Sequence, residues 1–259
     1  MSVAEEYDKL VEQAKVDDNI LGFFLAGSRG RGTQTDNSDW DCYMIVKDEA
    51  AEEYKNKYKE LFKGLKVYSL TDFKDYGRIG SNTEWAGYGF SYLKVQVDKL
   101  DDGSGIQSLV DEKATLPSEV AEKLIDKAAG SYINSVYRSI KNIRDERQIA
   151  SWLDAAESIP FFFTAMFALE SRLRPYNKYL EWELQTKPLK YMDLTPGQLI
   201  QLIKQIGHAG NITAEQKLLL YFRKAYSNSG HSEIVEQWGD KLTFMLTFKN
   251  SASEPIDRL

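Results

Sequence analysis

The sequence predicts an α+β fold in which a mixed sheet with helices, residues 1–116, precedes a helical bundle, residues 117–259. Short runs rich in β-branched and aromatic residues are concentrated before residue 100. From Pro117 onward, apolar residues instead recur with the period of a helix face. The elements of the first part do not alternate strand with helix, which argues against a parallel βαβ arrangement. A chain of 259 residues is long enough for two domains, and we expect the boundary near residue 116.

The elements of the first part follow from their apolar spacing. Residues 3–16 predict an amphipathic helix, because their apolar side chains recur at helical spacing. The next segments are short apolar runs, typical of strands, and one helix rich in Glu, Lys and Ala. In chain order we expect strand 20–26, strand 40–46, helix 49–62, strand 66–70 and strand 89–97.

The second part shows helical periodicity throughout. Its first helix carries apolar residues at steps of four, namely Val120, Leu124, Ala128, Tyr132, Val136 and Ile140. Three or four further helices are expected, separated by turn-forming segments at 172–177, 193–198, 207–211 and 227–233. We predict that an aromatic run in one of these helices lies in the core: Phe161, Phe162, Phe163 and Phe167.

Composition narrows the classes of function. The net charge of -6 argues against broad binding to extended nucleic acid. One cysteine and two histidines leave too few ligands for a His/Cys zinc site, and His208 and His231 are expected at the surface. A metal would therefore be held by carboxylates, which favours Mg²⁺.

Three observations favour a cytoplasmic protein. A single cysteine fits a reducing compartment. The longest apolar run, residues 159–169, has eleven residues, whereas a bilayer span needs roughly 20. The first ten residues show neither the basic nor the apolar segment of an export signal. We expect no membrane partner.

The segment "LAGSRGRGTQTDNSDWDCYMIV", residues 25–46, holds the candidate site. Glycine lets the backbone approach a ligand closely, so Gly27 and Ser28 could hold phosphate oxygens through N–H groups and a hydroxyl. Asp39 and Asp41 would project to the same side of an extended chain, with Cα atoms about 7 Å apart. Arg29 and Arg31 could add charge-assisted contacts to the same anion. A solvated turn is the alternative for the Asp pair, and no P-loop or G-x-G-x-x-G motif is present.

The combination of a strand, Gly-Ser, ten intervening residues and Asp-apolar-Asp resembles the signature of the DNA polymerase β-like nucleotidyltransferase superfamily. The resemblance covers roughly residues 20 to 100. It implies that Gly27 and Ser28 bind the β- and γ-phosphates of a nucleotide, while Asp39 and Asp41 bind Mg²⁺. It also implies a third acidic residue on a later strand. Asp98, at the end of the last predicted strand, is the first choice, and Glu84 is the second.

Residues 135–184 resemble the helical domain of aminoglycoside- and lincosamide-modifying nucleotidyltransferases, above all in "FALESRLRPYNKYLEWEL". We expect Arg138 and Lys178 to contact the nucleotide across a cleft that this domain closes. The alternative is that Lys178 is solvated and that the neighbouring arginines complement a helix C-terminus. Asp154 and Glu157 share a helix face, which would suit a cationic acceptor or a solvated surface.

These resemblances imply a Mg²⁺-dependent enzyme, with two ions, that transfers a nucleoside monophosphate, AMP from ATP or another NTP, to a hydroxyl of a small acceptor. Asp98 would act as general base. An aminoglycoside-like or lincosamide-like acceptor would imply a role in antibiotic resistance. The alternatives are nucleotidylation of a protein and a catalytically silent nucleotide-binding module. A polymerase is disfavoured because Lys and Arg total 33 against 39 acids. The sequence leaves open the acceptor, the preferred nucleotide and the oligomeric state.

Overall fold

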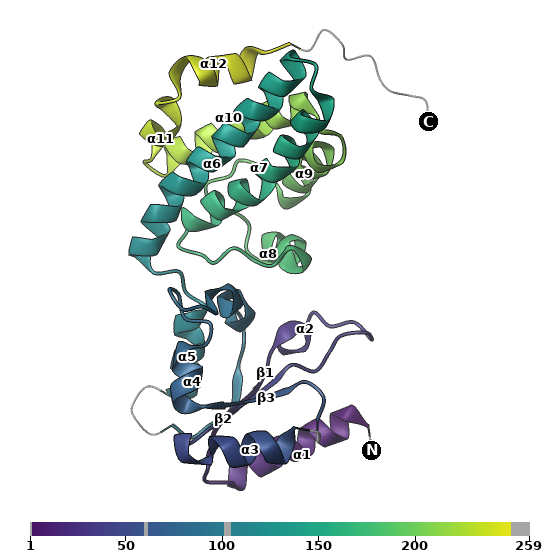
Figure 1. Ribbon diagram of the computed structural model, residues 1–259, viewed down its shortest axis with the longest axis vertical. Coiled ribbons are helices and arrows are strands. Elements are labelled where there is room, and N and C mark those ends of the chain that lie inside the picture. The colour runs from purple at the N-terminus through teal and green to yellow at the C-terminus, as the bar shows by residue number, and fades with distance from the viewer. Residues whose placement is uncertain (1, 60–61, 101–104, 250–259) are drawn as a thin grey trace. The chain divides into compact units, whose positions relative to one another are not determined.

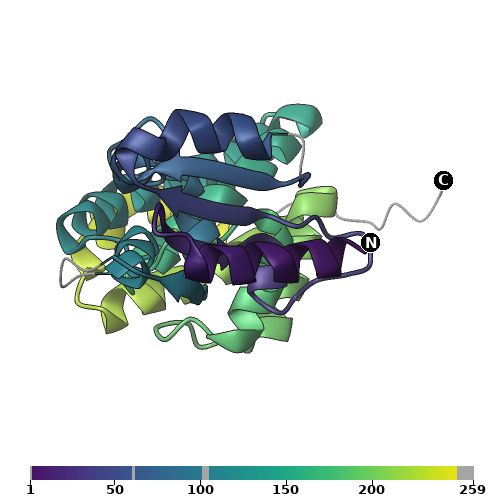
Figure 2. The ribbon, with the colours of Figure 1, turned by 90° about the horizontal axis from the view of Figure 1, so that it is seen from below.

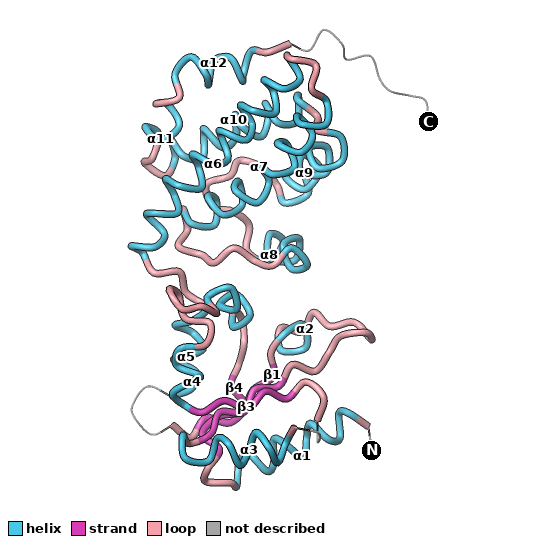
Figure 3. Tube along the Cα trace, in the orientation of Figure 1, coloured by secondary structure: helices cyan, strands magenta, loops and turns pink. Residues whose placement is uncertain are grey.

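The structure, a computed structural model, describes residues 2–59, 62–100 and 105–249. The chain divides into two compact units, Met1–Leu116 and Pro117–Leu259. Every described strand lies in the N-terminal unit, whereas the described part of the C-terminal unit consists of helices and loops (Figure 3). The mixed sheet and the helical second unit confirm the α+β class.

The N-terminal unit is built on a four-stranded sheet with the order β3-β2-β1-β4. Strand β1 is antiparallel to both β2 and β4, and β2 is parallel to β3. Among the helices, η1 and η2 are of the 3-10 type. In chain order the elements are α1 (Val3–Val16), β1 (Ile20–Leu25), α2 (Gly27–Gly30), β2 (Cys42–Val46), η1 (Asp48–Ala50), α3 (Ala51–Tyr58), β3 (Leu65–Ser69), α4 (Leu70–Asp75), η2 (Glu84–Phe90), β4 (Val95–Asp98) and α5 (Gly105–Lys113).

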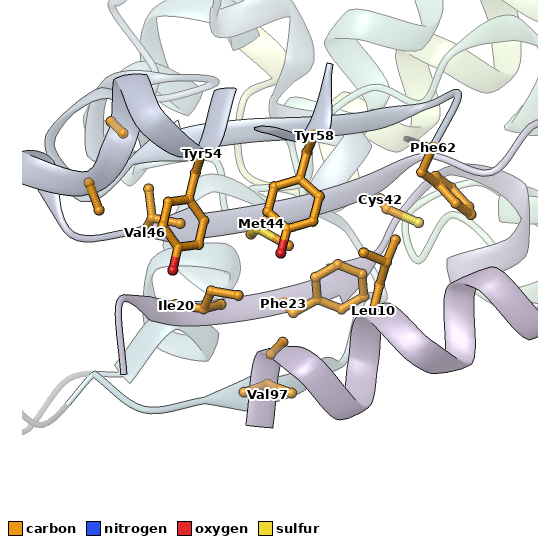
Figure 4. Close-up of a cluster of buried hydrophobic side chains, with 13 residues drawn as sticks. Leu10, Ile20, Phe23, Cys42, Met44, Val46, Tyr54, Tyr58, Phe62 and Val97 are labelled. Atoms are coloured by element: carbon orange, nitrogen blue, oxygen red, sulfur yellow. The ribbon is translucent and has the colours of Figure 1, made fainter. Parts of the chain in front are cut away.

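The two central strands of this sheet, β1 and β2, are buried on both faces. Phe23 and Met44 belong to a cluster beneath α1 and α3, and in Figure 4 Tyr54 and Tyr58 point from α3 toward the strands. Figure 2 views the chain from that side and shows α1 and α3 in front of the strands. The adjacent residue Phe24 packs on the opposite face with residues of α4, η2 and α5. Burial on both faces explains why β2 reads as an unbroken apolar run.

One end of the sheet, here called the site end, gathers four strand termini. The last residue of β1, Leu25, pairs with Cys42, the first residue of β2. Cys42 also pairs with Leu65, where β3 begins. Strand β4 begins at Val95, which lies opposite Phe24. Residues that follow β1, or that precede β2, β3 and β4, therefore lie at this same end.

The predicted strand 89–97 is wrong in its first half. The segment Glu84–Phe90 forms η2, and β4 covers only Val95–Asp98. Phe90 is buried against Phe24 and Phe73, so the apolar residues of this segment fill the core from a helical turn. Tyr92 then takes a positive φ of 65°, which turns the chain into β4.

The C-terminal unit is organised around α6 and α7, which pack along each other (Figure 1). Phe162, Phe163 and Phe167 are buried as predicted, whereas Phe161 is only partly buried. Tyr132 of α6 packs against Phe162 and against Phe222 of α10. The elements are α6 (Ser118–Arg144), α7 (Gln148–Ala168), η3 (Asn177–Tyr179), α8 (Leu180–Thr186), α9 (Pro196–Ala209), α10 (Ile212–Asn228), α11 (Ser232–Glu236) and α12 (Gly239–Thr247).

Local sequence explains where several helices begin and end. Ser2 and Glu5 form a capping box at the start of α1, and Thr195 and Gln198 form another at the start of α9. Gly210 ends α9 in the left-handed conformation, with φ 55°. Within the described residues, none of the helices combines the length and the apolar composition that a membrane span requires.

A polar cluster lies inside the C-terminal unit. Ser139 of α6 donates a hydrogen bond of 3.0 Å to Oε1 of Glu215, and its hydroxyl lies 3.2 Å from that of Ser151 in α7. Glu215 is fully buried, and its Oε2 has no hydrogen-bond partner among the described residues. Burial raises the pKa of Glu215 to about 8. Its carboxyl group is therefore protonated in the folded protein at neutral pH.

Glu215 should make the C-terminal unit less stable as the pH rises. Between the ordinary value of 4.5 and about 8, the folded state keeps a proton that the unfolded state loses. The free energy of unfolding then falls by about 1.4 kcal/mol per pH unit, with no further loss from this group above that range. Urea unfolding at several pH values should show that Glu215→Gln flattens this slope. Glu233→Gln, at an exposed position in α11, should leave it unchanged, and identical profiles for all three proteins would contradict the assignment.

Candidate nucleotide and metal site

Asp41 lies directly against the turn that follows β1. The N–H of Ala26 donates a hydrogen bond of 2.7 Å to the backbone carbonyl of Asp41. Gly27 has a φ of 63°, and a Cβ at this position would lie 2.5 Å from Oδ2 of Asp41. Only glycine meets both conditions, because the conformation and the space exclude a side chain. The fold therefore brings the carboxylate and the Gly-Ser turn into contact.

Arg29 fixes the segment that carries Asp39. Its Nε and Nη2 donate hydrogen bonds of 3.1 and 2.9 Å to the carbonyl oxygen of Ser38. Its guanidinium group also lies 4.6 Å from the ring centroid of Trp40. Arg29 thus holds the residues on both sides of Asp39, whose own side chain is exposed. The predicted contact of Arg29 with nucleotide stays a prediction, and its observed contacts are those of a positioning residue.

Arg31 ties the same turn to η2. It donates hydrogen bonds to the carbonyl oxygens of Gly27, Tyr88 and Gly89. The carbonyl of Ser28 accepts bonds from the N–H and the hydroxyl of Thr33. The turn after β1 is therefore held by its own side chains, which is the preorganisation a phosphate site requires.

The residues around Asp41 pack on different faces of the sheet. Trp40 and Cys42 pack with the cluster beneath α1 and α3. Tyr43 packs on the other face of the sheet. Strand β2 itself begins only at Cys42, so Asp39 and Asp41 precede the strand.

Lys66 is a site residue that sequence reasoning missed. It lies on β3 in register with Tyr43, one residue beyond the pair formed by Cys42 and Leu65. Its Nζ lies 3.6 Å from Oδ1 of Asp41 and 3.5 Å from the hydroxyl of Tyr43. The two oxygens of Asp41 thus face different groups, one the Gly27 turn and the other a lysine. No local motif marks Lys66, because its position depends on the parallel pairing of β2 with β3.

The expectation that Asp98 joins the Asp pair is corrected by the strand pairing. Asp98 pairs with Gly22, whereas the site end lies beyond Leu25. At about 3.3 Å per residue, Asp98 is roughly 10 Å or more from the site end. Its carboxylate instead accepts hydrogen bonds of 2.9 Å from the N–H groups of Ile106 and Gln107. Asp98 therefore caps the first turn of α5.

Replacing Asp98 by Ala should lower stability and leave ligand binding intact. The change removes the acceptors of two N–H groups at the start of α5, which typically costs about 1 kcal/mol. Denaturant unfolding of the N-terminal unit would measure the loss. Asp98→Asn, which keeps one acceptor oxygen, should lose less. A strong decrease in Mg²⁺ or nucleotide binding with unchanged stability would instead show that Asp98 is a residue of the site.

The second choice, Glu84, does not complete the site either. It lies in η2, is exposed, and accepts a hydrogen bond from the N–H of Gly80. Across residues 2–59, 62–100 and 105–249, no group of three or more His, Cys, Asp or Glu residues is arranged to hold a metal ion. At the site end, β4 presents Gln96, whose Oε1 accepts a bond from the N–H of Leu25. Mg²⁺ commonly takes one or two carboxylates together with phosphate oxygens, so Asp39 and Asp41 are the residues that could hold one ion, whereas a second ion would find no third carboxylate among the described residues.

Arg138 and Lys178 lie in the C-terminal unit. Arg138 forms ion pairs with Asp154, at 2.7 Å, and with Glu157. The two acids that share a face of α7 thus bind a cation of α6. Lys178 is exposed, its Nζ lies 4.7 Å from the ring centroid of Tyr179, and it has no carboxylate within ion-pair distance among the described residues. Contact of either residue with nucleotide stays a prediction.

No model of a protein family matches the chain, and a search of curated proteins finds no significant match. The residues of the site and the resemblance of their spacing are therefore the features that bear on function.

Proposed function

We propose that the N-terminal unit binds a nucleoside triphosphate with Mg²⁺ and transfers its nucleoside monophosphate to a hydroxyl group of a second substrate. Gly27 and Ser28 hold phosphate oxygens, and Asp39 and Asp41 would hold the ion. The reaction forms a bond between the acceptor oxygen and the α-phosphorus. It breaks the bond to the bridging oxygen, pyrophosphate leaves, and the acceptor hydroxyl loses its proton to the solvent or to a base.

The observation that carries this proposal is the contact between Asp41 and Gly27. Oδ2 of Asp41 lies so close to the backbone of Gly27 that a Cβ there would be at 2.5 Å. A phosphate held by the turn would therefore meet a carboxylate, and two anions side by side need a cation between them. Mg²⁺ commonly joins one or two carboxylates to substrate phosphates. The resemblance to polymerase β-like nucleotidyltransferases supports the same assignment.

The residues of the chain contribute mainly position and charge. Arg29 contacts the residues on both sides of Asp39, because it donates to the backbone carbonyl of Ser38 and lies over the ring of Trp40. Arg31 fixes Gly27 relative to η2. The bound ion supplies neutralisation of the developing negative charge on the phosphates. Such a site lowers the barrier by holding reactants in place, with little covalent chemistry on the protein.

A second candidate function is a nucleotide-binding module without turnover. It is favoured by the absence, among the described residues, of a third carboxylate beside Asp39 and Asp41. Such a module would bind Mg²⁺ and nucleotide through the same residues. It would lack the acid that accepts the proton of the acceptor hydroxyl.

One experiment separates the two functions. Pyrophosphate release is measured from each NTP with Mg²⁺, against aminoglycosides, lincosamides, other small hydroxyl compounds and a protein lysate. Release that depends on an acceptor would support transfer and identify its class. A rise in melting temperature with Mg²⁺ and NTP, without release, would support the silent module. Neither release nor a thermal shift would reject both.

A further inference from the structure

Lys66 is oriented toward the site by its place in the sheet. Lys66 and Tyr68 are two residues apart on β3 and so share one face of the strand, and Tyr68 packs on the same face of the sheet as Tyr43. Its Nζ lies 5.1 Å from the ring centroid of Tyr43 and 3.6 Å from Oδ1 of Asp41. Strand β3 thus places an ammonium group, and not a carboxylate, beside Asp41.

The ion pair between Lys66 and Asp41 is easily exchanged. The side chains of Lys66 and Asp41 are 44% and 39% exposed, so water screens their attraction. Lysine is a compact charge on a flexible stem with three donors, and it can turn from a carboxylate to a nearby phosphate. The other two cations of the site are already engaged, because Arg29 and Arg31 donate to backbone carbonyls.

We propose that Lys66 supplies the second positive charge of the site, so that the protein binds its nucleotide with one divalent ion and not two. This inference rests on the proposed nucleotide site. Without ligand, the ammonium group balances Asp41. With nucleotide and one Mg²⁺ bound at Asp41 and the Gly27 turn, the same group would turn to the triphosphate. Lys66 is then a positioning and charge-balancing residue of this site.

Two further features make the lysine fit this role. The carboxylate of Asp41 has one oxygen directed at Gly27 and the other at Lys66, so an ion near Gly27 and the ammonium group can be bound together. A second Mg²⁺ on Oδ1 would have to displace Lys66 and would find no third carboxylate among the described residues. Two divalent ions and a lysine at one exposed carboxylate would also repel one another.

The test uses Mn²⁺ as the probe, in place of Mg²⁺, because its binding can be followed by electron paramagnetic resonance. The wild type is titrated with Mn²⁺ alone, and then with Mn²⁺ and a non-hydrolysable ATP analogue. The variants are Lys66→Met and Lys66→Arg. Lys55→Met is the matched control, because Lys55 pairs with acids of the same unit and is 40% exposed. Lys66→Gln, which keeps a polar side chain, serves if the Met variant does not fold.

We expect one Mn²⁺ per bound nucleotide in the wild type. Lys66→Met should bind Mn²⁺ alone several-fold more tightly, because the ammonium group that repels the ion is gone. It should bind the Mn²⁺–nucleotide complex about tenfold more weakly, because a charge on the triphosphate is lost. Lys66→Arg should retain most of both properties, and Lys55→Met should match the wild type. If Lys66 only packed on Tyr43, its replacement by Met would not strengthen the binding of Mn²⁺ alone.

The failure of this inference can be told from failure of the proposed function. Two Mn²⁺ per nucleotide, or a Lys66→Met protein that matches the control, would overturn the role of Lys66 while nucleotide binding stands. If no nucleotide binds at all, the proposed function fails. The titration with Mn²⁺ alone still decides whether Lys66 competes for Asp41, and an unchanged affinity there overturns the inference.

Discussion

Replacing Asp41 by Asn should reduce acceptor-dependent pyrophosphate release by about 10³-fold or more, because the site loses the charge that holds the ion against the phosphates. The amide has the size of the carboxylate and can keep the contact with Gly27. The lost ion pair with Lys66 is half-exposed and contributes about 0–1 kcal/mol, so the melting temperature should hardly change. The measurements are pyrophosphate release, Mn²⁺ affinity and thermal unfolding.

The control for Asp41→Asn is Asp36→Asn. Asp36 is an exposed acid in the loop between α2 and β2 and lies outside the pair that would hold the ion. Its replacement should leave both release and Mn²⁺ affinity unchanged. If Asp41→Asn turned over as fast as this control, the metal assignment would be wrong, and the Asp pair would be the solvated turn that its local sequence also allows.

Replacing Arg172 by Met should destabilise the C-terminal unit by about 3–5 kcal/mol, which is the typical cost of breaking a buried ion pair from one side. Arg172 is 9% exposed and donates hydrogen bonds to Glu170, Glu183 and the carbonyl of Lys187. Its guanidinium group also lies 4.8 Å from the ring centroid of Phe167. The replacement removes the ion pair between Arg172 and the buried carboxylate of Glu183. Urea unfolding followed by circular dichroism would measure the loss.

Arg223→Met is the matched control for this prediction. Arg223 also forms two hydrogen bonds with one carboxylate, that of Glu236, but the side chains are 43% and 45% exposed. Its loss should cost at most about 1 kcal/mol. The double replacement Arg172→Met with Glu183→Gln should recover part of the stability, because the uncompensated charge is removed. Equal losses in Arg172→Met and Arg223→Met would contradict the assignment of a buried network.

The elements that the sequence predicts well are those whose periodicity is local. Helix α1 has the predicted bounds, and β1, β2 and β3 lie within one or two residues of the predicted strands. The segment Glu84–Phe90 was predicted in part as strand because it is aromatic and apolar. The side chain of Phe90 is buried in the core from this 3-10 helix, and that packing decides between the two conformations.

The contacts within the candidate site depend on how the strands pair, which the spacing of residues along the chain does not determine. The contact of Gly27 with Asp41 follows from the antiparallel pairing of β1 with β2, which places Leu25 opposite Cys42 although residues 26–41 lie between the two strands. Whether Asp98 or Lys66 approaches Asp41 depends on the order and direction of β3 and β4 in the sheet. Strand β4 runs antiparallel to β1 and carries Asp98 away from the site end, and β3 runs parallel to β2 and brings Lys66 to it.

Long-range ion pairs in the C-terminal unit cannot be predicted from the sequence for the same reason. The spacing of Asp154 and Glu157 predicts that they share a helix face. It does not show that the packing of α6 on α7 brings Arg138 to both of them. Arg172 likewise finds Glu183 only because the chain folds back between α7 and α8.

The rate at which a reagent modifies Cys42, the single cysteine of the chain, reports how often the N-terminal unit opens. Cys42 is fully buried directly after Asp41, and burial raises the pKa of its thiol to about 12. A thiol reagent can therefore react only through rare openings of the sheet, at a rate set by how often they occur. Since Cys42 is the only cysteine, this rate reports on the N-terminal unit alone. A ligand that binds beside Asp41 should slow the modification of the Cys42 sulfur more strongly the tighter it binds. The modification rate therefore also measures occupancy of the site.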